Sequence, residues 1–322
     1  MARAREGGMG VIHKNLTIVD QAKMVDRVKR SESGMIMDPV TMDKDKTIRE
    51  AKAAMSHYHV SGLHVLDGDK LVGILTNRDI RFETNLDLKV YERMTKENLV
   101  TVPVGTTLEK AKDILQEHRI EKLLVVDDNG KLAGLITVKD IQKKEDFPNA
   151  CIDKNGRLRV GAAVGVGVDS LERAEALADA NVDIVVIDTA HGHSVGVLAK
   201  VASIKKKLGD RIGLIVGNVA TADAVDALID AGVDCVKVGI GAGASCTTRV
   251  IAGIGVPQLT AVMNCVDAAA KKDIPVISDG GIRYSGDIAK ALASGAESVM
   301  LGSLLAGMDE SPGESILYEG RQ

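Results

Sequence analysis

The sequence predicts a parallel α/β fold that is interrupted by an inserted, internally duplicated segment. From residue 160 onward, short apolar runs alternate with segments that carry apolar residues at three- and four-residue spacing. The core must be built from aliphatic residues, because the 322 residues include only two Phe, four Tyr and no Trp. With 33 Gly, this composition is typical of parallel sheets buried on both faces. A repeat at an offset of about 60 residues marks the insertion.

The α/β part begins with one isolated strand and resumes after the insertion. Residues 8–13 are expected to form a strand, and 18–29 the helix that follows it. Six later apolar runs bring the expected number of strands to seven. These runs are 160–165, 183–190, 213–220, 235–241, 275–281 and 298–306. The helical patterns between them are 169–181, 195–208, 221–231, 260–272 and 285–294.

The insertion carries two copies of one pattern. Residues 60–80 match residues 120–141, and each match follows a helical pattern, at 47–57 and 107–118. Its most specific element is Gly-apolar-apolar-Thr-x-x-Asp, which occurs at 73–79 and at 134–140. This arrangement resembles a pair of CBS domains.

The duplicated Thr and Asp residues are candidates for nucleotide binding. A hydroxyl near a helix N-terminus can meet a phosphate, and a carboxylate can chelate a ribose diol. We therefore expect Thr76, Asp79, Thr137 and Asp140 to bind adenine or guanine nucleotides as regulators. The alternative is that both Asp residues only cap helices.

Charge and cysteine usage exclude several classes of protein. There are 41 Lys and Arg against 45 Asp and Glu, which gives a net charge of −4 and no basic field for nucleic acid. No apolar run reaches the roughly 18 residues of a membrane span, and residues 1–10 lack a signal peptide's apolar region, so a cytoplasmic protein is expected. The four Cys form no CxxC pair, which argues against a zinc site and against a disulfide framework.

Cys246 ends a glycine-rich loop that follows the predicted strand 235–241. The alternating Gly239, Gly241 and Gly243 allow positive φ and let backbone dipoles point into one concavity. A partly exposed thiol among such dipoles favours a reactive thiolate. The alternative is a tight turn followed by an ordinary small core residue.

Polar residues also gather at the ends of other predicted strands. Asp188 and Thr189 stand where one strand gives way to a helix, and Asp279 precedes Gly280 and Gly281. The last strand ends with Gly302 and Ser303. In a (β/α)8 barrel this face holds the active site, and bare amides with a carboxylate suit a phosphate and a diol. Each Asp alone would more often be a helix cap.

Taken together, these segments resemble the inosine-5′-monophosphate (IMP) dehydrogenase family over essentially the whole chain. The matching segments are 7–15, 147–150, 160–165, 188–194, 217–219, 238–249, 255–258 and 278–282, with the CBS pair. The resemblance implies a (β/α)8 TIM barrel formed by residues 1–35 and 147–322, with about seven strands present. It places tandem CBS domains at 36–92 and 93–146. It also implies that the first barrel strand and a C-terminal flap are missing, so we expect a chain truncated at both ends with little turnover.

The resemblance further implies an activity, a homotetramer and a set of residue roles. IMP would be oxidised to XMP with NAD, in guanine nucleotide biosynthesis, through a covalent thioimidate on Cys246 that Thr248 helps to hydrolyse. Residues expected to meet NAD are Asp188, Thr189, Asn218, Gly239 and Gly241. Residues expected to meet IMP are Ser245, Asp279, Gly280, Gly281, Gly302 and Ser303. Carbonyls of Gly241, Gly243 and Cys246 would hold a monovalent cation, normally potassium, and ATP or GTP would bind the CBS pair.

Two other functions are compatible with the same residues. A GMP reductase-like enzyme would share the barrel, the Cys-Thr-Thr segment and the phosphate site, but would carry out a reductive deamination with NADPH. A catalytically inactive nucleotide sensor would keep the CBS pair as its working site. Residues 188–193 and 254–258 resemble the dehydrogenase more than the reductase, as does the insertion.

Overall fold

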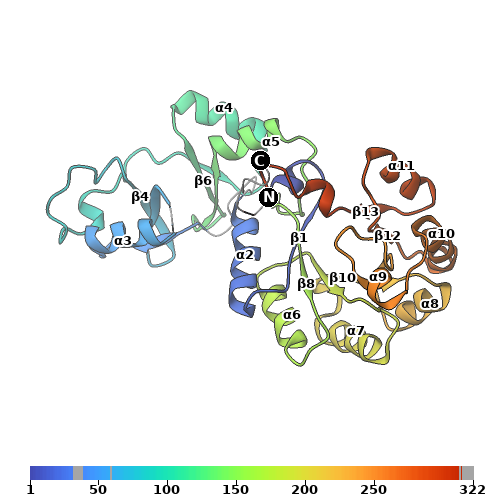
Figure 1. Cartoon of the computed structure of the whole chain (residues 1–322). Helices are drawn as coiled ribbons and strands as arrows, with labels where there is room; N and C mark the ends of the chain where they lie inside the picture. Colours follow the sequence, from blue (N-terminus) through green and yellow to red (C-terminus); the bar gives the residue numbers. More distant parts are fainter. Residues whose placement is uncertain (32–38, 59, 312, 314–322) are drawn as a thin grey trace, which may run out of the picture. The chain divides into compact units, whose positions relative to one another are not determined.

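The computed structural model describes residues 1–31, 39–58, 60–311 and 313, which form two compact units (Figure 1). Unit 1 comprises Met1–Lys29 and Arg159–Gln322, and unit 2 comprises Arg30–Leu158. The sequence placed these boundaries at 35/36 and 146/147. The two compact units divide at 29/30 and 158/159, and the predicted domain boundaries stay a prediction.

Among its described residues, unit 1 is built on one sheet of seven parallel strands, in the order β1-β8-β9-β10-β11-β12-β13. The isolated strand β1 (Gly10–Ile12) pairs with β8 (Val160–Val164), so the sheet joins across the insertion. The remaining strands are β9 (Ile184–Asp188), β10 (Gly213–Val219), β11 (Cys235–Val238), β12 (Val276–Asp279) and β13 (Ser298–Met300). The parallel α/β fold with seven strands is therefore confirmed, and its curled sheet resembles a TIM barrel (Figure 1).

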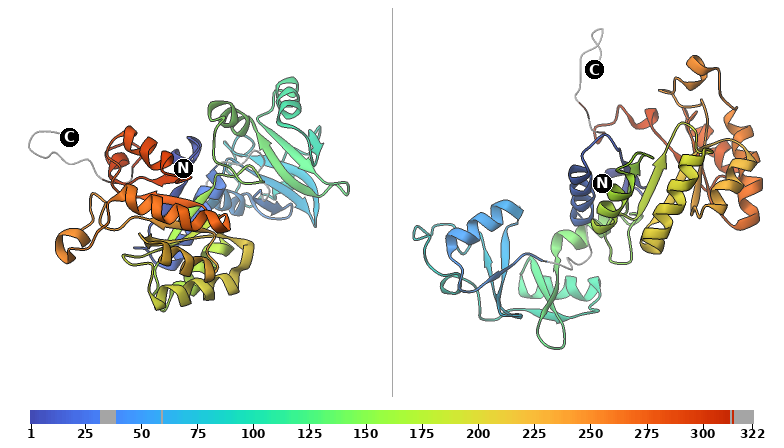
Figure 2. Two further views of the ribbon diagram at one scale, coloured as in Figure 1. Left: turned by 90° about the vertical axis from the view of Figure 1, so that its right-hand side faces the viewer. Right: turned by 90° about the horizontal axis from the view of Figure 1, so that it is seen from below.

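Helices cover the outer face of this sheet, as both views of Figure 2 show. The helices of unit 1 begin with α1 (Ala2–Arg5) and α2 (Ile18–Ser31) and continue after the insertion. The later helices are α6 (Ser170–Asp179), α7 (Val195–Leu208), α8 (Ala222–Asp230), α9 (Thr248–Ala252), α10 (Gln258–Ala269) and α11 (Ser285–Ala293). Single turns of 3₁₀ helix are η2 (Gly209–Arg211), η3 (Ala270–Lys272) and η4 (Ser303–Leu305). Aliphatic residues from the helices and from alternate strand positions form the main core, to which the short helices α1 and α9 contribute no residue.

The opposite face of the sheet holds a smaller apolar cluster, which points away from the helices. It consists of Val186, Ile215 and Cys235, with Ile184 and Ile277 packed against them. Because side chains alternate along a strand, residues two positions further on face the same side. At the carboxyl end of the strands, this face therefore presents Asp188, Gly217, Lys237 and Asp279.

In its described ranges, 30–31, 39–58 and 60–158, unit 2 contains two three-stranded sheets with the same order of elements. One sheet has β2 (Thr41–Asp43), β3 (Gly62–Asp67) and β4 (Lys70–Thr76), and the other has β5 (Thr101–Pro103), β6 (Lys122–Val126) and β7 (Leu132–Thr137). In each sheet a parallel pair is followed by an antiparallel hairpin. The helices are α3 (Ile48–Tyr58), α4 (Leu108–His118) and α5 (Val138–Asp146), with the 3₁₀ turn η1 (Val90–Glu92). The repeated order of elements agrees with the sequence repeat, while the CBS assignment stays a prediction.

Within the described residues, no helix combines the length and the apolar character that crossing a membrane requires.

Candidate active site

The candidate site lies at the carboxyl ends of β9 to β12, around one buried lysine. Lys237 interrupts the otherwise apolar strand β11, and its side chain is only 1% exposed. Asp188, Gly217 and Lys237 are in register across β9, β10 and β11. A buried ammonium is stable only when it is paired, so the polar partners of Lys237 define the site.

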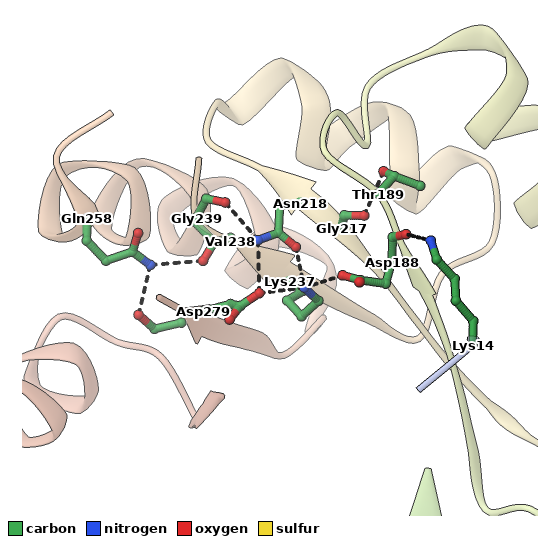
Figure 3. Close-up of polar contacts among 11 residues, drawn as sticks. Lys14, Asp188, Thr189, Gly217, Asn218, Lys237, Val238, Gly239, Gln258 and Asp279 are labelled. Carbon is green, nitrogen blue, oxygen red and sulfur yellow. Dashed lines mark hydrogen bonds and ion pairs between the residues drawn. The ribbon is translucent and has the colours of Figure 1, made fainter. Parts of the chain in front are cut away.

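Three oxygen acceptors surround the Lys237 ammonium, as Figure 3 shows. The Nζ atom donates to Asp188 Oδ1 at 3.0 Å and to Asp279 Oδ2 at 2.5 Å. It also donates to Oδ1 of Asn218. The three N–H bonds of one ammonium thus join side chains from β9, β10 and β12.

Two amide side chains hold the neighbouring strand ends together. Asn218 Nδ2 donates to Asp279 Oδ2 at 2.9 Å and to the carbonyl of Gly239 at 2.7 Å. Gln258, the first residue of α10, donates to the carbonyl of Val238 at 2.9 Å and to Ser278 Oγ at 3.0 Å. The ends of β11 and β12 are therefore fixed by hydrogen bonds to side chains, in addition to those of the sheet (Figure 3).

Two glycines permit this close approach. A Cβ on Gly217 would lie 2.4 Å from the carbonyl oxygen of Lys237, so the lysine side chain passes over β10 only because no side chain stands there. Gly239 has φ +150°, and a Cβ there would lie 1.9 Å from the carbonyl oxygen of Asp279. Both positions require glycine on steric grounds.

The loop that carries Cys246 packs against the segment that follows Asp279. A Cβ on Gly280 would lie 3.0 Å from the backbone nitrogen of Gly243. The Cys246 N–H donates to the carbonyl of Gly243 at 3.1 Å, which folds the loop back on itself. The thiol loop and the Asp279 segment therefore form adjoining walls.

Cys246 is half-exposed, and its surroundings favour the thiolate over the thiol. The hydroxyl and then the backbone N–H of Thr248 lower the pKa of its thiol, and backbone hydrogen bonds at Gly241 and Arg249 add to this effect. Burial instead raises the pKa of both Cys235 and Cys265 to about 12. Cys246 is therefore in the environment of a reactive thiol, and these two are not.

The structure brings many of the predicted residues together, but not all. Asp188, Asn218, Gly239 and Asp279 share the Lys237 network. Thr189 lies beside it, where its Oγ1 donates to the carbonyl of Gly217 at 2.9 Å. Gly241, Gly243, Gly280, Gly281, Cys246 and Thr248 belong to the two adjoining loops. Across the described ranges, no hydrogen bond joins Ser245, Gly302 or Ser303 to this group.

The predicted nucleotide residues of unit 2 satisfy one another locally. Thr76 N and Oγ1 both donate to Asp79 Oδ2, each at 2.7 Å. Thr137 Oγ1 donates to Asp140 Oδ2 at 2.6 Å, and this pair forms a capping box at the start of α5. The capping geometry considered from the sequence is thus present at α5, and nucleotide binding at these four residues stays a prediction.

Sequence reasoning missed Lys237, Gln258 and Lys14. Lys14 donates to the backbone carbonyl of Asp188 at 3.1 Å (Figure 3). For Lys237 a signal was present, because a lysine inside an apolar strand of a parallel sheet must be buried and therefore paired. Gln258 and Lys14 carry no comparable local signal.

In the part of the chain that the structure describes, no group of three or more His, Cys, Asp or Glu side chains could hold a metal ion. A cation in the Cys246 loop would therefore depend on backbone carbonyls. Gly241 in this loop has φ +81°, a conformation that favours glycine.

Known proteins are similar to this chain over its whole length. A model of the IMP dehydrogenase / GMP reductase domain matches residues 1–322. Inosine-5′-monophosphate dehydrogenases from Halalkalibacterium halodurans and Aquifex aeolicus are 58% and 57% identical to the chain over its whole length. The chain spans 66% of the length of each of these relatives.

Solved structures indicate the same family. A GMP reductase from Trypanosoma brucei in complex with guanosine 5′-monophosphate is 39% identical and superimposes with a TM-score of 0.85. The match covers 99% of this chain and 68% of the reductase. The chain therefore belongs to the IMP dehydrogenase / GMP reductase family.

Proposed function

We propose that this chain carries out the IMP dehydrogenase reaction, the NAD-dependent oxidation of IMP to XMP in guanine nucleotide biosynthesis. The observation that carries the proposal is the juxtaposition of the Cys246 loop, whose thiol has a lowered pKa, with the segment that follows Asp279. The dehydrogenases that are 57–58% identical to the chain favour the same assignment.

Cys246 is the proposed nucleophile. Its thiolate adds to C2 of the purine, a C–S bond forms, and the hydrogen on C2 leaves with its electron pair as hydride. Water then adds to C2 of the resulting thioimidate, the C–S bond breaks, and the thiolate leaves while one proton is released to solvent. Thr248 contributes by stabilising the thiolate at both the start and the end of this cycle.

Asp188 and Asp279 are the proposed ribose ligands, for NAD and IMP respectively. Each carboxylate uses one oxygen for Lys237, and within the described residues the other oxygen accepts no hydrogen bond. The side chains of Asp188 and Asp279 are 51% and 22% exposed, so each can still accept from a diol. These open carboxylates fit a dinucleotide and a nucleotide, and the nicotinamide ring of NAD supplies the hydride acceptor.

The other proposed NAD contacts are assigned from their positions in the site. Thr189, Asn218, Gly239 and Gly241 flank Asp188 or the Cys246 loop, and we assign them to the dinucleotide. Residues assigned to the IMP phosphate and ribose, beside Asp279, are Ser245, Gly280, Gly281, Gly302 and Ser303. Carbonyls of Gly241, Gly243 and Cys246 are proposed to hold potassium.

Unit 2 is proposed to be a regulatory CBS pair that binds ATP or GTP. Thr76 with Asp79, and Thr137 with Asp140, place a hydroxyl and a carboxylate at equivalent points of the two repeats. We assign the CBS pair to residues 36–146 and the barrel to 1–35 and 147–322. We further propose that the enzyme is a cytoplasmic homotetramer.

The test is an absorbance assay for NADH with IMP and NAD, using C246A as the inactive control. NADH formation that C246A abolishes supports the dehydrogenase, whether it continues over many turnovers or stops at about one NADH per subunit. NADPH consumption with GMP would instead support the reductase, which the Trypanosoma brucei structures make the second candidate. Binding of ATP or GTP with neither reaction would support a nucleotide sensor.

A further inference from the structure

We propose that Lys237 is a positioning residue that couples the IMP site to the NAD site. The proposal rests on the function proposed above, in which Asp188 meets one ribose and Asp279 the other. A single ammonium bonds to Asp188 Oδ1 at 3.0 Å and to Asp279 Oδ2 at 2.5 Å. Any change at one carboxylate therefore reaches the other through one cation.

Lys237 is placed to act through the carboxylates and not on a ligand. Its side chain is 1% exposed, and its three N–H bonds are taken by Asp188, Asn218 and Asp279. No donor remains for a ligand. Within the described residues, Asp188 Oδ2 and Asp279 Oδ1 accept no hydrogen bond, so each carboxylate has one oxygen for the lysine and one left for its ribose.

The charge balance of the cluster makes the two sites interdependent. Two carboxylates share one buried ammonium, so neither is fully neutralised while both are ionised. If Asp188 loses its charge, the ammonium pairs with Asp279 alone and makes that carboxylate a weaker acceptor for a ribose hydroxyl. Groups in one hydrogen-bonded network show interaction energies of this kind.

Gly217 makes the bridge possible, because it lies between Asp188 and Lys237 in the register of the sheet. A Cβ there would lie 2.7 Å from Lys237 Cβ. The lysine can therefore reach across a whole strand only over a glycine. This geometry separates Lys237 from an ordinary surface lysine that pairs with its nearest neighbour.

The test is a double-mutant cycle on IMP binding, measured by calorimetry on the full chain without NAD. The proteins are wild type, D188N, K237M and the double variant. Asp188 is assigned to the NAD site. If Lys237 had only a structural role, substitution of Asp188 would therefore leave the affinity for IMP unchanged. We expect D188N to weaken IMP binding at least about threefold when Lys237 is present, and less than about twofold with K237M. K237R, which keeps the cation, should restore the coupling.

A matched control comes from a second buried pair in the same unit. Lys29 bonds to Asp183 at 2.5 Å and is 3% exposed, but Asp183 precedes β9 at the opposite end from Asp188. K29M combined with D188N should show no coupling in IMP affinity. This control separates a specific role of Lys237 from the general loss of a buried ion pair.

The outcomes distinguish failure of the proposed function from failure of the coupling. If wild type binds no IMP, the proposed function fails and the coupling fails with it. If wild type binds IMP but the two substitutions act additively, the coupling alone is overturned. If circular dichroism shows that K237M does not fold, D188N is compared in the wild-type and K237R backgrounds. A threefold loss in both then supports the bridge, and a change below twofold in both refutes it.

Discussion

Cys246 should react with iodoacetamide far faster than the two buried cysteines. Its pKa lies below the ordinary 9.0, whereas those of Cys235 and Cys265 are about 12. At pH 7.5 at least about 3% of Cys246 is thiolate, roughly a thousand times the fraction expected at a pKa of 12. A thiolate of higher pKa is intrinsically more nucleophilic, by about thirtyfold over three pKa units. The net advantage of Cys246 is therefore at least about thirtyfold, before burial slows the other two further.

The assay is limited alkylation of the folded protein at pH 7.5, followed by peptide mapping over time. T248V removes the side-chain hydrogen bond that contributes most to the lowered pKa, so labelling of Cys246 should slow at this pH. The half-exposed Cys151 serves as the internal comparison outside the loop. Equal labelling rates for Cys246 and Cys265 in protein that remains folded would refute the reasoning.

Three further predictions follow from close contacts, buried charge and the repeat. G217A should lower the free energy of unfolding by about 1–3 kcal/mol, because its Cβ would overlap Lys237. G10A is the control, since its Cβ meets nothing within 4 Å and should leave the melting temperature nearly unchanged. Burial, assisted by the charge of Lys122, lowers the pKa of His64 below 6.5. The unfolded chain therefore takes up this proton first, and stability should fall as the pH drops below 6.5. The difference in melting temperature between pH 7.5 and 5.5 should be smaller for H64Q than for wild type. D79N should weaken calorimetric binding of ATP or GTP to the full chain, and an unchanged isotherm would contradict the assignment.

The strands could be predicted from sequence because their apolar runs are long and well separated. Their ends could not, because a run of apolar residues and glycines does not show where the backbone leaves the extended region. The strand expected at 235–241 ends at Val238, since Gly239 turns to φ +150°. Likewise, the strand expected at 298–306 ends at Met300, and η4 follows it.

The residues of the site could be predicted in part. Asp188 and Asp279 were found because strand ends of a parallel sheet meet at one edge. Lys237 was missed because its partners lie 49 and 42 residues away, and nothing local indicates them. For Thr137 and Asp140 the same motif serves a helix cap and a nucleotide site, so sequence alone cannot separate the two.

The pairing of β1 with β8 has a consequence for the order of folding. Gly10 pairs with Val160, so this contact closes a loop of about 150 residues. If unit 2 folds first, only about 20 residues of unit 1 remain flexible inside that loop, and the entropic cost of closure falls by roughly 2 kcal/mol. During synthesis of the chain, β1 would then stay unpaired until the insertion had folded and β8 had been made. Mutations that slow the folding of unit 2 would therefore delay completion of the sheet of unit 1.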